Sequence, residues 1–148
     1  EEKKNPGQEL VSRIDEIMGE HLSDLQFSLD DVAAELYISP NYLRQLFKQA
    51  SGQTFTEHLT EMRMKEAQRL LDDESLKIYE VAERTGYADS RYFSVCYKKY
   101  WHITPTDYRR TLQESRQYLL GGQGLRQRIM FRLYLTCGRL ATWIDSRR

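Results

Sequence analysis

Polar and basic side chains line one side of a helix that the sequence predicts from Pro40 onward. Proline favours a helix start directly after Ser39, because its missing N–H would have no helical partner there. Leu43 and Phe47 fall on the opposite, apolar side. Asparagine and glutamine can each form two hydrogen bonds with adenine, and arginine can do so with guanine. The candidate base contacts are Pro40, Asn41, Arg44 and Gln45, and Lys48, one turn further on, is placed for a phosphate.

A similar set of side chains returns later in the chain. Arginine and serine can bond to base edges there, whereas a valine can at most touch a thymine methyl group. Two consecutive lysines follow and suit phosphate oxygens. The predicted base contacts are Ser90, Arg91, Ser94 and Val95, and the predicted phosphate contacts are Lys98 and Lys99.

Both stretches belong to an internal repeat, in which each copy is a short helix, a tight turn and a second helix. This is the helix-turn-helix pattern, and we expect it over about residues 28–52 and 77–101. The offset between matching residues grows by one at the turn, so the added residue falls there. The pairs are Val32-Ala33 with Val81-Ala82 at an offset of 49, and Tyr42-Leu43 with Tyr92-Phe93, Phe47-Lys48 with Tyr97-Lys98 and Thr54 with Thr104 at an offset of 50.

A long helix is predicted between the two repeats, over residues 54–72. Thr54 and Glu57 fit a capping box, in which the hydroxyl accepts a backbone N–H and the glutamate reaches back. The nineteen residues span roughly 28 Å as a helix, close to the ~34 Å of one DNA turn. We therefore expect this helix to fix the distance between the two helices that read bases.

The remaining segments complete an all-α fold of two helix-turn-helix subdomains joined by a long central helix. Residues 1–7 form a charged lead-in that is typical of disorder or of the end of an interdomain linker, which suggests a fragment. A helix is predicted over about residues 8–21, and Thr104, Pro105 and Asp107 predict a last helix over residues 104–112. The expected DNA-binding domain thus spans residues 8–112, followed by an atypical basic tail, residues 113–148.

The formal net charge is zero, which at first sight argues against a nucleic-acid partner. The charge is unevenly distributed, however. Residues 1–36 carry three basic and ten acidic side chains, residues 37–112 carry twelve and ten, and residues 113–148 carry seven and two. A local basic face, which is what attracts phosphate, is therefore compatible with the zero total.

Other function classes lack their usual residues. Cys96 and Cys137 have no CxxC spacing, and His21, His58 and His102 are scattered, so we expect neither a metal site nor a disulfide framework. The pattern contains no Gly-rich phosphate loop or nucleophile triad, so we expect no enzyme and no cofactor. No apolar run approaches the ~18 residues that cross a bilayer, and no signal peptide is recognisable. A cytoplasmic protein without a membrane partner is the expectation.

The tail, residues 113–148, differs in composition from the rest of the chain. It contains seven arginines and no lysine, and its glycines at 121, 122 and 124 are typical of a flexible joint. Three interpretations stay open: an extension introduced by cloning or a frame shift, a basic amphipathic helix that docks on a partner or DNA, and a membrane-surface segment.

The motifs together resemble the DNA-binding domain of the AraC/XylS family of bacterial transcription regulators. The resemblance covers residues 10–112 and is carried by residues 28–71, by residues 77–100 and by TPTDYR at 104–109. It implies seven helices and the insertion of two recognition helices into successive major grooves. Two residues depart from the family pattern: Val95 stands where an arginine is common, and His102 stands where a glycine usually ends the helix.

The resemblance also suggests partners besides double-stranded DNA. The segments LYISPNYL and KIYEVAERTGYAD resemble the sequences of family members that are attached to receiver domains. An upstream sensor or receiver domain is therefore an expected partner, and RNA polymerase is another. The alternative function is a helical protein-interaction module that docks on a sensor domain or RNA polymerase. Binding to duplex DNA at physiological salt would discriminate between the two.

Overall fold

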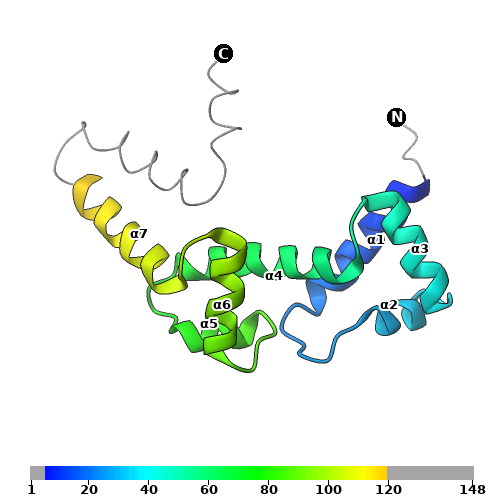
Figure 1. The fold of residues 1–148 in the computed structure, drawn as a ribbon, viewed down its shortest axis with the longest axis horizontal. Coiled ribbons are helices and arrows are strands. Elements are labelled where there is room, and N and C mark those ends of the chain that lie inside the picture. Colours follow the sequence, from blue (N-terminus) through cyan, green and yellow to red (C-terminus); the bar gives the residue numbers. More distant parts are fainter. Residues whose placement is uncertain (1–5, 120–148) are drawn as a thin grey trace, which may run out of the picture. The chain divides into compact units, whose positions relative to one another are not determined.

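The computed structural model describes residues 6–119, and this part of the chain is all α-helical (Figure 1). Along the chain, a pair of one short and one longer helix precedes the long helix and another such pair follows it, as predicted. In chain order the helices are α1 (Pro6–Glu20), α2 (Leu29–Glu35), α3 (Pro40–Ser51), α4 (Phe55–Leu71), α5 (Ile78–Arg84), α6 (Ser90–Trp101) and α7 (Pro105–Leu119).

Two predicted boundaries are wrong. Pro6 and Gly7, which we assigned to the lead-in, form the first turn of α1, because proline fits the first position of a helix. The last helix continues beyond the predicted end at Leu112 to Leu119, since no glycine or proline interrupts residues 113–119. The change in composition at residue 113 is therefore not a structural boundary. The rest of the tail, residues 120–148, lies outside the described residues.

Capping side chains determine where several helices begin. At α4 the backbone N–H of Thr54 donates to the Glu57 carboxylate at 2.9 Å, and the Thr54 hydroxyl accepts from the Glu57 N–H at 3.2 Å. This is the predicted capping box. The Asp107 N–H donates in the same way to the Thr104 hydroxyl, at 3.1 Å, at the start of α7.

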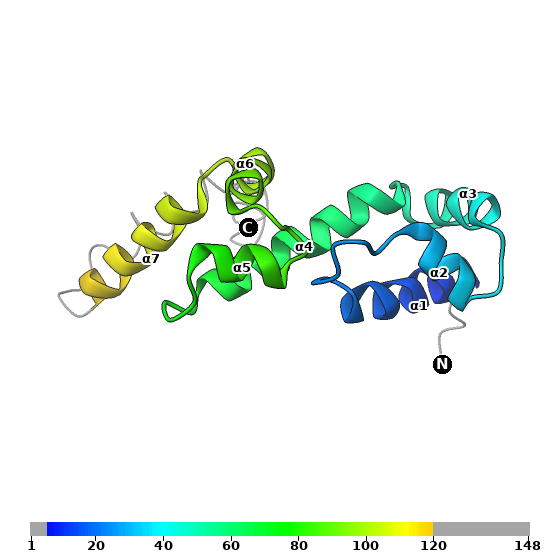
Figure 2. The ribbon, with the colours of Figure 1, turned by 90° about the horizontal axis from the view of Figure 1, so that it is seen from below.

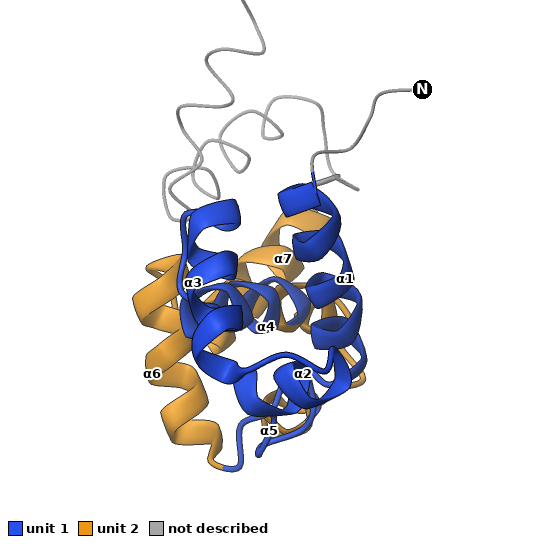
Figure 3. Ribbon diagram, turned by 90° about the vertical axis from the view of Figure 1, so that its right-hand side faces the viewer, with its two compact units in different colours: residues 1–66, 84–88 blue, residues 67–83, 89–148 orange. Residues whose placement is uncertain are grey.

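The chain forms two compact units (Figure 3). The described part of unit 1 is residues 6–66 and 84–88, and the described part of unit 2 is residues 67–83 and 89–119. Helix α4 contributes to both units. Residues 84–88, which are the last residue of α5 and most of the turn that follows it, belong to unit 1 although α6 belongs to unit 2, so the sequence repeat and the compact units do not coincide.

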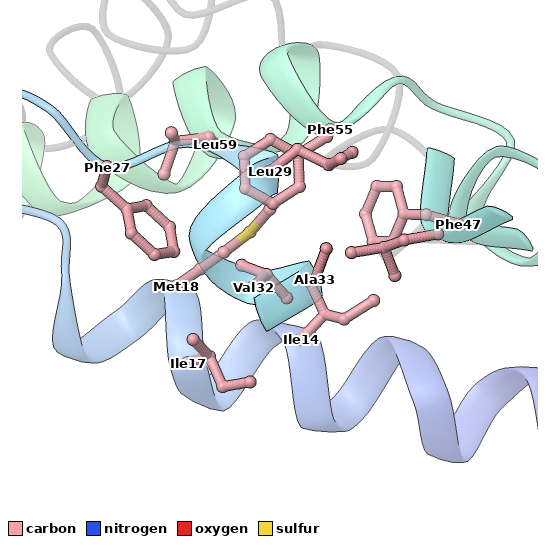
Figure 4. Close-up of a cluster of buried hydrophobic side chains, with 11 residues drawn as sticks. Ile14, Ile17, Met18, Phe27, Leu29, Val32, Ala33, Phe47, Phe55 and Leu59 are labelled. Atoms are coloured by element: carbon pink, nitrogen blue, oxygen red, sulfur yellow. The ribbon is translucent and has the colours of Figure 1, made fainter. Parts of the chain in front are cut away.

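The core of unit 1 is formed by α1, α2, α3 and the first half of α4 (Figures 2 and 4). Its residues recur at helical spacing, which is why each helix buries one face. His58 packs edge-on against Phe47, and its Nε2 lies at hydrogen-bond distance, 2.6 Å, from an Asp15 carboxylate oxygen. A polar interaction therefore accompanies the apolar contacts. The buried side chains are Ile14, Ile17, Met18, Phe27, Leu29, Val32, Ala33, Leu43, Phe47, Phe55 and Leu59.

In unit 2, α7 is fastened to the end of α4 and the loop that follows it. The Arg109 guanidinium donates to the backbone carbonyls of Leu71, Asp73 and Leu76, at 3.2, 3.2 and 2.6 Å. The bond to Leu71 satisfies a carbonyl group that the end of α4 leaves without a helical partner, and the other two bonds hold the loop. Arg116 also donates to the Glu74 carboxylate at 2.7 Å, so residues assigned to the tail take part in the structure of unit 2.

Candidate nucleic-acid interface

Helix α3 has well-defined ends. The Ser39 hydroxyl accepts from the Tyr42 N–H at 3.3 Å, and Pro40 occupies the first helical position. At the other end Gly52 takes the left-handed conformation, with a φ of 75°, and its N–H donates to the Lys48 carbonyl at 2.9 Å. Capping at both ends determines where α3 begins and ends.

The outer face of α3 carries all five predicted contact residues in exposed positions. Leu43 and Phe47 are fully buried on the other side of the helix. The Arg44 guanidinium donates to the Asn41 side-chain oxygen at 2.8 Å, so these two side chains form a pair on the surface. The exposed residues are Pro40, Asn41, Arg44, Gln45 and Lys48.

Helix α6 presents a weaker set of hydrogen-bonding groups. Arg91 is exposed, and Val95 leaves 64% of its surface exposed without any polar atom in its side chain. Ser90 and Ser94 are half-buried, and the Ser94 hydroxyl already donates to the Ser90 carbonyl at 2.8 Å. A serine bonded to its own helix has no hydrogen left to donate to a base edge. Lys98 and Lys99 are exposed, one turn further along the helix.

The C-terminal end of α6 shows how the chain accommodates His102. This residue adopts the left-handed conformation with a φ of 62°, and its N–H donates to the Lys98 carbonyl at 2.8 Å. It thus ends α6 as Gly52 ends α3, although a left-handed residue with a side chain costs roughly 1 kcal/mol. The departure from glycine at this position therefore leaves the left-handed cap in place, at the cost of strain.

The two candidate recognition helices are basic, with no acidic residue inside either helix. The N-terminus of α3, capped by the neutral Ser39, adds a partial positive charge that favours phosphate oxygens, whereas the Asp89 carboxylate offsets that charge at the N-terminus of α6. Lys48 has one acidic neighbour: hydrogen bonds from Thr54, and to a smaller extent the charge of Lys48, lower the pKa of Glu57. The basic character is therefore local, as the uneven charge distribution indicated.

Tyr42 and Tyr92 are two outer-face residues that the site prediction missed. They stand at matching positions of α3 and α6 and leave 54% and 62% of their surfaces exposed. A hydrogen bond with the Cys96 thiol raises the pKa of Tyr92. The repeat pairs the two tyrosines in the sequence, so the signal was available, but aromatic residues at helical spacing suggest core positions.

Other kinds of site find no support in residues 6–119. Within them, no three histidine, cysteine, aspartate or glutamate side chains are grouped as ligands of a metal ion. No helix in that range combines the length and apolarity needed to span a bilayer.

A family model described as a helix-turn-helix domain matches residues 32–111, which run from within α2 to within α7 and include α3, α4, α5 and α6. The transcriptional activator RhaR of Cronobacter sakazakii is 40% identical over 86 residues, 58% of this chain and 30% of the activator. The C-terminal domain of the two-component response regulator yesN of Fusobacterium nucleatum is 39% identical, with a TM-score of 0.65 over 68% of this chain and 98% of that domain.

A third similar protein is the DNA-binding domain of the transcriptional factor AdpA, solved in complex with a target DNA. It is 26% identical, with a TM-score of 0.64 over 77% of this chain and 98% of that domain. The chain spans about 30% of the length of the curated relatives that it matches first. By its family match and its helix pairs, the chain belongs to the AraC-type helix-turn-helix family of DNA-binding transcriptional regulators.

Proposed function

We propose that α3 and α6 are recognition helices that enter successive major grooves of one duplex and read its sequence. The observation that carries this proposal is the paired surface: two capped helices of equal length at matching repeat positions, each basic outside and apolar inside. A helix of this kind fits a major groove about 12 Å wide.

The side chains have different roles in this proposal. Asn41, Arg44 and Gln45 form hydrogen bonds to base edges from α3, with Pro40 in apolar contact. On α6, Arg91 makes the principal polar contact and Val95 contacts a thymine methyl group, while Ser90 and Ser94 contribute less. Lys48, Lys98 and Lys99 bind phosphates and hold both helices in register.

Selection of binding sites from a random duplex pool tests this function. We expect one preferred site and an affinity that falls steeply with salt. Gln45→Ala should relax the preference at single base pairs, whereas Lys98→Ala should weaken all sequences alike. Lys65→Ala is the control, because it also removes a positive charge but from α4, where Lys65 pairs with Glu61. No preferred site for the wild-type chain would contradict the proposal.

The proposed partners besides DNA are an upstream sensor or receiver domain and RNA polymerase. Two observations support an upstream domain: the similarity to the C-terminal domain of a response regulator, and the small part of the length of a curated relative, 29%, that the chain covers. We propose that the protein regulates transcription in the bacterial cytoplasm by binding, without catalysis. Attachment to a receiver domain predicts that phosphorylation of that domain changes DNA affinity.

A further inference from the structure

A half-buried guanidinium lies where three segments of unit 1 meet. Arg63 projects from α4, and its Nη2 donates a hydrogen bond of 2.7 Å to the Asp24 carbonyl in the segment after α1. Its Cζ lies 6.0 Å from the ring centroid of Tyr87, in the turn of residues 84–88. That distance is at the outer limit of a cation–π contact. Arg63 therefore joins α4 to two chain segments that are distant in sequence.

Gly86 in the same turn is fitted closely against this side chain. Its φ is +80°, and a Cβ atom at this position would lie 2.6 Å from the Leu22 carbonyl oxygen and 2.7 Å from the Arg63 Cζ. Heavy atoms cannot approach so closely, so the guanidinium occupies space that any side chain at residue 86 would need. The turn and the arginine are thus complementary in shape.

Burial of this charge is costly for the fold. Burial lowers the pKa of Arg63, against the opposing effects of Tyr87 and Asp24. The buried Nε has no hydrogen-bond partner among residues 6–119. An uncharged side chain of similar length would avoid this desolvation. Net stability alone is therefore a poor reason for an arginine at this position, and its fixed geometry is a better one.

The turn held by Arg63 leads directly into α6. Asp89, the capping residue of α6, follows Ala88, the last residue of the turn. We propose that Arg63 is a positioning residue for DNA reading by α6, which acts by holding the turn of residues 84–88 in one conformation. This inference rests on the proposed function of α6 and makes no use of a contact between Arg63 and DNA.

The test measures each half of the binding site separately. The full 148-residue chain is titrated with the selected duplex and with duplexes in which one half-site or the other is scrambled. The loss of affinity on scrambling gives the contribution of each half. In Arg63→Met, the contribution of the half read by α6 should fall about tenfold, the scale of a lost base contact. The contribution of the half read by α3 should not change.

Two further variants separate geometry from charge. Arg63→Lys keeps the charge but loses the planar fork, so we expect an intermediate loss. Lys65→Met removes a positive charge from the same helix without approaching the turn, and it should behave as the wild type. Equal losses in both half-sites, or no loss in Arg63→Met, would overturn the inference. If scrambling the half assigned to α6 has no effect in the wild type, the proposed function of α6 fails instead.

A glycine pair gives the same information if Arg63→Met folds poorly. Gly86→Ala inserts a methyl group against Arg63 and Leu22, whereas Gly52→Ala meets no atom within 4 Å at a similar φ of +75°. Both variants carry the strain of a left-handed alanine. Only Gly86→Ala should reduce the contribution of the half read by α6, and hydrogen exchange of residues 84–89 should accelerate in that variant alone. Identical behaviour of the two variants would contradict a positioning role for the turn.

Discussion

The two helix-turn-helix motifs share one backbone pattern but place different residues at its left-handed turn position. Each turn needs a left-handed residue, which is Tyr37 in the first motif and Gly86 in the second, with φ values of 56° and 80°. Tyr37 leaves 96% of its surface exposed, so it meets no steric obstacle. Gly86 is buried against Leu22 and Arg63 and has no room for a side chain. The same backbone position is thus limited by strain alone in one motif and by packing in the other.

The recognition helices differ in the polar side chains on their outer faces. Helix α3 carries Asn41, Arg44 and Gln45 on its outer face, whereas α6 offers one long polar side chain, Arg91, near its start. The first motif is therefore rich in groups that distinguish bases, and the second is held more tightly at its turn. We infer that α3 supplies most of the sequence preference and that α6 supplies affinity in a fixed register.

The largest expected effect comes from interrupting the helix that both motifs share. Glu61→Pro should remove a backbone hydrogen bond within α4 and cost about 3 kcal/mol of stability or more. Affinity for the full site should fall strongly, because a continuous helix no longer connects the two motifs. Glu61→Ala is the matched control, since it also removes the bonds from Gln53 and Lys65 but keeps the helix. Titration of the selected duplex measures both variants, and full affinity in Glu61→Pro would refute the spacer role of α4.

The second expected effect compares the two outer faces directly. Gln45→Ala should cost about 1–3 kcal/mol of binding free energy and broaden the preference at one base pair. Val95→Ala should cost less, because a valine loses only an apolar contact with a methyl group. Competition with single-base variants of the site measures both. A larger loss of binding free energy in Val95→Ala than in Gln45→Ala would contradict the inference that α3 supplies most of the sequence preference.

The third effect concerns the two C-terminal caps. His102→Gly should stabilise the protein by about 0.5 to 1 kcal/mol, because glycine adopts the left-handed conformation without strain but gains freedom in the unfolded chain. Gly52→Ala should destabilise it by a similar amount for the opposite reason. Chemical denaturation of the two variants tests this prediction. A destabilised His102→Gly would mean that the imidazole makes a contact worth more than the strain it carries.

The sequence predicted the caps and the exposed positions of α3 that it named because both depend on residues close together in the chain. Ser39 with Pro40, Thr54 with Glu57, and the spacing of Asn41 and Arg44 are all local patterns. The role of Arg63 could not be predicted in this way, since its partners lie 39 residues before it and in the turn of residues 84–88. The end of α7 was also missed: the absence of glycine and proline from residues 113–119 permits the helix to continue, but the bonds of Arg116 to Glu74 and to the Asp72 carbonyl are made to residues distant in sequence.

The smallest expected effect is the pH dependence that Glu57 contributes through the cap of α4. Hydrogen bonds from the Thr54 backbone and hydroxyl lower the pKa of Glu57 in the folded protein. Its contribution to stability is therefore complete above the unfolded value of about 4.3 and is lost as the pH falls through the lower folded value.

Unfolding by urea at pH 6 and pH 3 measures this contribution. The loss of stability between the two pH values should be smaller in Glu57→Gln than in the wild type, because glutamine does not titrate. Thr54→Val should give an intermediate result, since it removes the hydroxyl but keeps the backbone N–H that contributes most to the shift. An unchanged pH dependence in Glu57→Gln would show that the cap of α4 is not formed in solution. The connection between α3 and α4 would then be less well defined than the structure shows, because only Gln53 separates Gly52, which ends α3, from Thr54.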